Sequence, residues 1–169
     1  IRKMASHIID IEAMTSDDCT FSVGVINAGT WVNCVSSEAT AEVLSMSKRQ
    51  QDLDDGIKKM LAFNDPDGDV MTKVSVGLTR PVWTASETGL KLVDLASRLS
   101  AQLGQPFHHE SSGGGSDGNF TGAMGVPTLD GLGVAGDKYH TLEEHIEIDS
   151  LSMRGKMMAG LLMNINHDL

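Results

Sequence analysis

One short segment, residues 137–145, gathers side chains that could bind a metal ion: two of the six histidines and two adjacent glutamates. Neutral imidazole is a good zinc ligand, so His140 is a candidate, and Glu143 or Glu144 could hold its second ring nitrogen. The five-residue step from His140 to His145 differs from the HExxH spacing of zinc-binding helices. The residue pattern alone leaves His140 open between a metal ligand and an ordinary surface histidine.

A glycine-rich loop, residues 113–118 (GGGSDG), is the most unusual local pattern in the chain. Glycines such as Gly114 and Gly115 let the backbone approach a ligand closely. Ser116 or Asp117 can cap the helix expected behind the loop, and a helix N-terminus favours an anion. The alternative is a plain tight loop that opens a helix, and the pattern does not decide between the two.

Three other patterns are weaker. The GxGxxG run at 131–136 lacks a helix directly behind it, so nucleotide binding is a third possibility with little support. The acidic run at 65–69 has its glycine too early for a calcium loop and predicts a turn. His108 and His109 could bind a metal ion, but adjacent residues on a strand point to opposite faces, so the pair does not predict a metal site. One candidate ligand is less than a catalytic zinc site, which needs about three protein ligands.

Composition narrows the classes of partner. The formal net charge of −10 argues against nucleic acid, which requires a basic face. No apolar run is long enough to cross a bilayer, so we expect no membrane partner. Two cysteines do not make a disulfide framework. The chain begins at Ile1 rather than Met, so we expect a processed or truncated product; the compartment stays open between cytoplasm and periplasm.

The first half of the chain predicts a small α+β layer with one covered sheet face. Apolar spacing predicts helices at its start and middle and strands between and after them. The expected elements are a helix over 1–14, strands over 20–26 and 39–47, a helix that Asp52 caps, and a strand over 70–76 after the turn at 64–69.

The second half alternates helix and strand, which predicts a mostly parallel α/β sheet. A capping box at 84–87 opens a long helix that ends at Gly104. A short helix around Phe120, a strand over 126–132 and a final helix capped by Asp149 follow. The expected boundary between the halves divides the chain into domains 1–80 and 81–169.

Two stretches carry a resemblance to a known family. The first is SSGGGSDGNFTGAMGVPTLDGLGVAGDKYHTLEEHIEIDSL, and the second is FSVGVINAGTWVNCVSSEATAEV. They resemble the C-terminal signature and the lid segment of the two-zinc exopeptidases and amidohydrolases, a family that includes glutamate carboxypeptidase, acetylornithine deacetylase and aminoacylase. The resemblance extends over nearly the whole chain and is closest to the glutamate carboxypeptidase branch.

The resemblance implies a ferredoxin-like α+β lid domain over 1–80, lacking its first strand, then the C-terminal part of an α/β catalytic domain. It implies a homodimer formed through the lid, and zinc, two ions in a complete site. The implied reaction is hydrolysis of a C–N amide or peptide bond in a small peptide-like or N-acyl amino acid substrate. The site residues carried over are His140 for metal and Asn33, Arg80, Gly114, Gly115 and Ser116 for substrate.

The same resemblance places the remaining metal ligands and the glutamate general base upstream of Ile1. It also places an arginine that clamps the substrate carboxylate where this chain has Met46. We therefore expect the chain alone to be inactive. The alternative is a non-catalytic dimerisation or binding module, or a degenerate paralogue of the enzymes.

Overall fold

The computed structural model describes residues 1–168, with side chains described as far as Ile165. The chain divides into two compact units, Ile1–Val82 and Trp83–Leu169, and each is described by itself. Both are mixed α/β structures with small sheets. None of the helices within the described range is long and apolar enough to cross a membrane.

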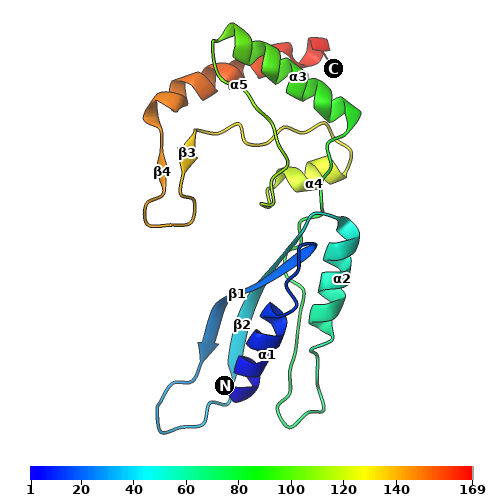
Figure 1. Cartoon of the computed structure of the whole chain (residues 1–169), viewed down its shortest axis with the longest axis vertical. Helices are drawn as coiled ribbons and strands as arrows, with labels where there is room; N and C mark the ends of the chain where they lie inside the picture. The colour runs from blue at the N-terminus through cyan, green and yellow to red at the C-terminus, as the bar shows by residue number, and fades with distance from the viewer. Residues whose placement is uncertain (169) are drawn as a thin grey trace. The chain divides into compact units, whose positions relative to one another are not determined.

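The first unit is a β-hairpin with two helices packed on one face (Figure 1). Its elements are α1 (Arg2–Glu12), β1 (Cys19–Ala28), β2 (Ala39–Ser47) and α2 (Gln50–Leu61). The strands pair antiparallel from Cys19 opposite Ser47 to Ala28 opposite Ala39, with an irregularity between Val23 and Val25. Alternation along each strand places one set of side chains under the helices and leaves the other set open to solvent.

The core of this unit lies where the helices meet the covered face of the hairpin. Ile11, Cys19 and Phe21 form a buried cluster, and Met14, Val23, Val43, Met60 and Phe63 pack against it. A Cβ built on Gly56 would lie 2.9 Å from Cys19 Sγ, so the glycine lets α2 sit close to β1. The two cysteines are free thiols, Cys19 buried and Cys34 exposed.

The open face of the hairpin carries apolar side chains. Leu44 and Met46 are 60% and 41% exposed. They stand opposite Ser22 and Thr20 in the register, and Glu42 is the next exposed side chain of β2 on this face, so the paired strands present apolar, hydroxyl and acidic groups there and no basic one. Arg49 is engaged elsewhere: its guanidinium contacts Asp52 at 2.6 Å and Asp18 at 3.3 Å.

Two expectations for the first unit are wrong. Residues 70–76 do not form a strand; the segment pairs only through a single bridge between Asp65 and Thr72. A strand needs a continuous run of backbone partners, and the N–H of Val74 instead donates to the side chain of Asn64. Asp52 does not cap α2 either, because the helix begins at Gln50 after Arg49, which binds Asp52 inside the first turn.

The charges along α2 are locally paired. Lys58 Nζ donates to Asp55 Oδ1 at 2.8 Å, and Gln51 Nε2 donates to Asp55 Oδ2 at 3.0 Å. The Lys58 ammonium first and the Gln51 amide second hold the pKa of Asp55 below its ordinary value of 3.8. The same contact with Asp55 raises the pKa of Lys58.

The Asp55 pairing predicts a titration result. Since the folded-state pKa is lowered, its contribution to stability is present above 3.8 and is lost as the pH falls through the lower folded value. Lys58→Ala is expected to bring the Asp55 pKa back up toward 3.8, as NMR titration of the carboxyl would report. Lys59→Ala is the matched control, because Lys59 makes only a weak charge contribution; an equal shift in both variants would contradict the assignment.

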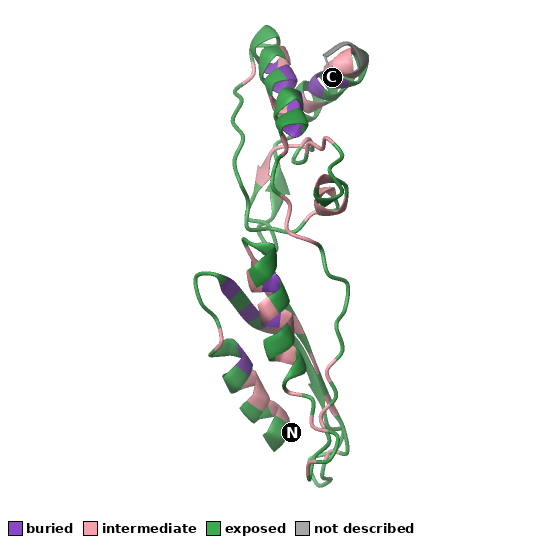
Figure 2. Cartoon of the chain, turned by 90° about the vertical axis from the view of Figure 1, so that its right-hand side faces the viewer, coloured by how far each residue is buried: buried purple, intermediate pink, exposed green. Residues whose placement is uncertain are grey.

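The second unit is built around two packed helices. Its elements are α3 (Glu87–Gln102), α4 (Gly118–Ala123), β3 (Gly136–Asp137), β4 (His145–Ile146) and α5 (Ile148–Asp168). Leu95 and Ala96 of α3 and Met157 and Leu161 of α5 form the buried cluster, against which Leu99, Leu129 and Leu132 pack. Figure 2 shows buried (purple) stretches alternating with exposed (green) ones along α3.

The mostly parallel sheet expected here is absent from the described residues, which hold only the antiparallel pairs β1–β2 and β3–β4. The segment 126–132 is not a strand, because no neighbouring strand offers it backbone partners. The helix starts also differ: Ser86, not Thr84, caps α3 by accepting from Gly89 N at 3.0 Å. Asp149 lies inside the first turn of α5 rather than at its cap.

Candidate functional site

His140 lies in a tight loop, residues 138–144, that joins β3 to β4. The two strands close the base of the loop, with Gly136 opposite Ile146 and Asp137 opposite His145. The buried Ser150 of α5 fixes this base, because its Oγ accepts from Ala135 N at 2.9 Å and donates to the carbonyl of Glu147. The loop that presents His140 is therefore anchored to the N-terminal end of α5.

The backbone of this loop is held in an unusual conformation. Lys138 and His140 have φ values of 58° and 64°, the left-handed region that residues with a side chain seldom adopt. Each such residue costs about 1–2 kcal/mol. Local hydrogen bonds offset that cost: Lys138 N donates to Asp137 Oδ1 at 2.7 Å, and Thr141 Oγ1 donates to Lys138 O at 2.7 Å. The strain fixes the direction in which His140 leaves the backbone.

The two glutamates of the loop bind partners other than the His140 ring, contrary to expectation. Glu144 Oε2 accepts from the backbone N–H of His140 at 3.2 Å, and Glu143 forms an ion pair with Lys138. His145 is bonded as well, through Nδ1 to the carbonyl of Glu143 at 2.9 Å. The His140 side chain is exposed, and its ring makes no hydrogen bond within residues 1–168. Both ring nitrogens are thus open to a ligand from outside this loop.

Zinc chemistry needs more donors than the described residues bring together. In that range no group of three His, Cys, Asp or Glu side chains could hold a metal ion. A catalytic zinc takes about three protein ligands, so this loop fits the role of one ligand and does not make a complete site. An exposed imidazole can supply one of the nitrogen, sulfur or oxygen ligands of a tetrahedral zinc site.

The glycine-rich loop is ordered by Ser112, Ser116 and Asn119. Ser112 Oγ accepts from Gly114 N at 3.1 Å. Ser116 Oγ accepts from Gly118 N at 3.1 Å, and the N–H of Ser116 donates to Asn119 Oδ1 at 2.9 Å. Asp117 holds the N-cap position of α4, so Ser116 orders the turn just before it. Gly114 and its neighbour Gly115 are exposed.

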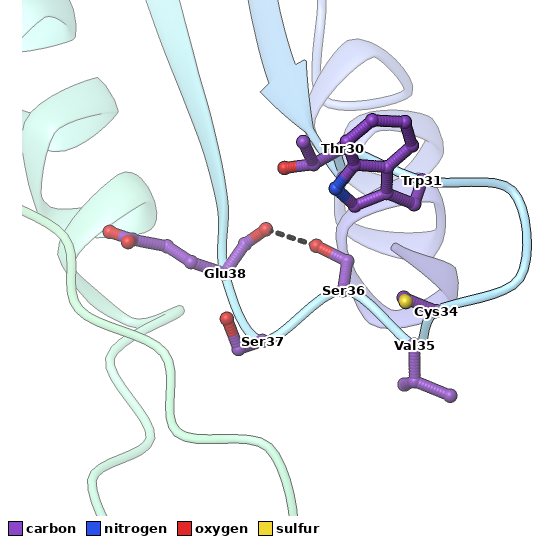
Figure 3. Close-up of a pocket in the computed structure, with 8 residues that line it drawn as sticks. Thr30, Trp31, Cys34, Val35, Ser36, Ser37 and Glu38 are labelled. Atoms are coloured by element: carbon purple, nitrogen blue, oxygen red, sulfur yellow. Dashed lines mark hydrogen bonds between the residues drawn. The ribbon is translucent and has the colours of Figure 1, made fainter.

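Asn33 lies in the loop that joins β1 to β2, residues 29–38. This loop encloses a hollow of about 360 Å³ lined by Gly29, Thr30, Trp31, Cys34, Val35, Ser36, Ser37 and Glu38. Figure 3 shows Ser36 donating to the carbonyl of Glu38, which closes one side of the loop. Asn33 is exposed beside the hollow rather than in its lining, and its Oδ1 accepts a weak contact from Cys34 Sγ at 3.8 Å.

Arg80 and Asn33 stand at opposite ends of the hairpin. Arg80 is two residues before Val82, whose N–H donates to Gln50 Oε1 at 2.9 Å, just past the end of β2. The 29–38 loop is at the other end, where β2 begins. The first unit therefore does not bring these two predicted substrate residues together. In the second unit, the hydrogen bonds named above for the glycine-rich loop and for the 138–144 loop join residues within each segment or to its immediate neighbours.

Two residues that hold the His140 loop in place were not predicted from the sequence. They are Ser150, which bonds the base of the loop, and Lys138, whose backbone is in the left-handed region. Asp137 could have indicated the turn at Lys138, since Asp side chains often bond the backbone N–H groups of a turn that follows them. The partner of Ser150 depends on the packing of α5 and leaves no local signal.

Gly136 offers a test of how the loop is held. A Cβ at this position would lie 2.4 Å from the carbonyl oxygen of His145, and neither backbone can move independently of the strand pair. Gly136→Ala is expected to open the β3–β4 pair and to destabilise the unit by about 1–3 kcal/mol. Amide hydrogen exchange over 136–146 and thermal unfolding measure both effects.

The matched control for that variant is Gly133→Ala, where a Cβ would meet nothing within 4 Å. Gly133→Ala should leave exchange in the strand pair unchanged. Equal loss of protection in the two variants would mean that the close approach at Gly136 does not hold the loop.

Comparison with known proteins places the chain among peptidases. The profile of Peptidase family M20/M25/M40 matches residues 4–164. Carboxypeptidase G2 of Pseudomonas sp. (strain RS-16) is 30% identical over 151 residues, which cover 86% of this chain and 36% of that protein. The uncharacterized protein YqjE of Bacillus subtilis (strain 168) is 26% identical over 149 residues, 86% of this chain and 40% of that protein.

Solved structures share the fold. A tripeptidase from Staphylococcus aureus subsp. aureus Mu50 matches with a TM-score of 0.70 and 23% identity, covering 95% of this chain and 44% of that one. The aminopeptidase PepT from Bacillus cereus ATCC 10987 matches with a TM-score of 0.62 and 22% identity, covering 96% and 45%. The chain thus spans less than half the length of the relatives that it matches.

Proposed function

Because the chain belongs to peptidase family M20/M25/M40, we propose that it is part of a metal-dependent hydrolase that cleaves a C–N amide or peptide bond and releases an amino acid. The observation that carries this proposal is the family match over residues 4–164. The 30% identity to carboxypeptidase G2 favours a carboxypeptidase-like reaction on a small peptide-like or N-acyl amino acid substrate.

In this proposal His140 is a zinc ligand. Its exposed ring and its left-handed backbone support the role, since a ligand whose direction is already set loses less conformational freedom when the metal binds. A zinc ion bound by its full set of protein ligands would polarise the substrate carbonyl and would lower the pKa of the water bound to it. The proposal requires further metal ligands and a general base besides His140, since a catalytic zinc takes about three protein ligands.

The substrate residues of the proposal are polar or lie on glycine loops. Asn33 and Arg80 are exposed and can stabilise charge on a substrate. Gly114 and Gly115 leave room for a substrate backbone, and Ser116 orders the turn beside them.

We assign residues 1–80 to a ferredoxin-like lid and residues 81–169 to the C-terminal part of a catalytic domain. The two helices on one face of the β1–β2 hairpin support the lid assignment. A homodimer through the lid would cover the outer edges of the hairpin, which within the described residues have no strand beside them.

The chain alone is expected to be inactive. Purified residues 1–169 with added zinc should release no amino acid from N-acyl amino acids, dipeptides or tripeptides above the rate of a buffer control. The physical reason is that His140 alone is short of the about three ligands that a catalytic zinc needs. Zinc-dependent turnover by the purified chain would contradict this expectation, and intact mass with metal content per chain would establish what was assayed.

A second candidate function is a non-catalytic dimerisation or binding module. It is favoured by the open face of the hairpin, where Leu44 and Met46 are exposed and Arg49 is held by Asp52 and Asp18. A face without a basic group gives little affinity for a substrate carboxylate. A protein that carries this chain and an intact metal site, yet hydrolyses none of these substrates, would support the module over the enzyme.

A further inference from the structure

The two adjacent glutamates of the 138–144 loop hold different groups. Glu144 Oε2 accepts from the backbone N–H of His140 at 3.2 Å, so its carboxylate reaches the main chain of the proposed metal ligand. Glu143 instead forms an ion pair with the ammonium group of Lys138. Both glutamates are exposed and carry the same type of charge, so what distinguishes Glu144 is its contact with the His140 backbone.

This contact bears on the direction of the His140 side chain, because His140 has a left-handed backbone with a φ of 64°. The ordinary helical region lies at φ values of about −50° to −90°, so a return to it would turn the residue by roughly 115° or more about its N–Cα bond. The imidazole would then leave the loop in another direction. The Glu144 contact ties the peptide plane before His140 to a residue four positions later, so φ at His140 cannot relax while that contact holds.

The anchor of this contact is itself fixed by the turn. The N–H of Glu144 donates to the carbonyl of Thr141 at 3.2 Å, and the N–H of Thr141 donates to the carbonyl of Lys138 at 3.2 Å. Tyr139 Oη donates to the carbonyl of Gly136 at 3.1 Å, which ties the residue before His140 to the base of the loop. These bonds close the turn around His140, and the Glu144 carboxylate joins His140 to it.

We propose that Glu144 is a positioning residue for His140. Its carboxylate holds the His140 backbone in the left-handed conformation, so the imidazole already has its direction when a metal ion binds. A ligand that is ordered in advance loses less conformational freedom on binding, so Glu144 raises metal affinity without touching the metal. This role rests on the proposed function, in which His140 is a zinc ligand. It differs from that of a carboxylate that bonds the second ring nitrogen of a ligating histidine.

The test measures zinc affinity in the enzyme that carries this chain, by competition with a chromophoric chelator. Glu144→Ala removes the acceptor and is expected to weaken zinc binding by about tenfold or more, as loss of a group that orients a metal ligand does. Glu144→Gln keeps a carbonyl acceptor on a side chain of the same length and removes only the charge, so it should retain the affinity. Glu143→Ala is the matched control, because it removes the same charge one residue away and leaves the His140 contact in place.

The conformation of His140 is measured separately, by NMR of the 169-residue chain without metal. A left-handed residue has its amide and α protons close together, so the nuclear Overhauser effect between them is strong. This strong signal is expected at His140 in the unaltered chain, in Glu144→Gln and in Glu143→Ala, and it is expected to weaken in Glu144→Ala. Thermal unfolding checks that the three variants stay folded, which the exposure of both glutamates favours.

Zinc binding by the unaltered enzyme distinguishes a failure of this role from a failure of the proposed function. If that enzyme binds no zinc, or if His140→Ala binds it fully, the proposed function fails and the role of Glu144 fails with it. If zinc binding needs His140 but Glu144→Ala keeps full affinity or an unchanged His140 signal, only the positioning role fails. Equal loss of affinity in Glu144→Gln and Glu144→Ala would also overturn that role, because the carboxylate would then act through its charge or as a ligand itself.

Discussion

His140→Ala is expected to lower kcat/KM by more than about a hundredfold in the metal-loaded enzyme that carries this chain, since even outer-shell metal partners are worth about 10–100-fold. The loss follows from the proposed role as a metal ligand, because no other histidine, cysteine or carboxylate among the described residues forms a group with it that could replace its donor. Zinc content per active site, measured by elemental analysis, is expected to fall together with activity.

His109→Ala is the matched control for this experiment. His109 is also exposed and lies outside the 138–144 loop, and its ring centroid is 6.4 Å from that of Phe107. It should change neither metal content nor kcat/KM. Full metal content in His140→Ala would contradict the assignment of His140 as a ligand, even if activity were lost, because loop damage alone could then explain the loss.

Phe21→Ala is expected to lower the free energy of unfolding of the first unit by about 3–5 kcal/mol. Phe21 is 4% exposed and sits in the small cluster with Ile11 and Cys19, so its removal leaves a cavity that few neighbours can fill. Typical domains are stable by about 5–15 kcal/mol, so this loss approaches the whole stability of a small one. Urea unfolding followed by hydrogen exchange over 19–28 reports on this unit specifically.

The control for Phe21 lies on the same strand but on the open face. Val25 is 43% exposed, so Val25→Ala removes methyl groups without opening a buried cavity. It should cost less than about 1 kcal/mol. A similar cost for both variants would mean that the contacts of Phe21 with the helices do not stabilise the unit.

The sequence predicted the elements that depend mainly on the local spacing of apolar residues. The bounds of β2 agree with the predicted 39–47, and both α1 and β1 fall within a few residues of expectation. The strands expected over 70–76 and 126–132 failed for one physical reason. Alternating apolar residues favour an extended backbone, but a strand exists only where another backbone supplies hydrogen bonds.

The candidate site was predictable in kind and not in geometry. That His140 lies in a loop was expected from the residues around it, but the roles of Glu143 and Glu144 were not. Their partners are set by the left-handed backbone at Lys138 and His140, which depends on hydrogen bonds formed only after the loop closes. Whether Asn33, Arg80 and the glycine-rich loop contact a substrate stays a prediction.

The two free cysteines give the first unit its own kinetic reporter. Cys34 is exposed and should react with a thiol reagent at once, whereas Cys19 is buried beneath Gly56 and reacts only after β1 separates from α2. When closing is fast, the slow labelling rate equals the intrinsic rate multiplied by the equilibrium constant for opening. A single mass-spectrometric time course thus measures the equilibrium constant for the local opening of this unit, with the Cys34 reaction as the internal standard.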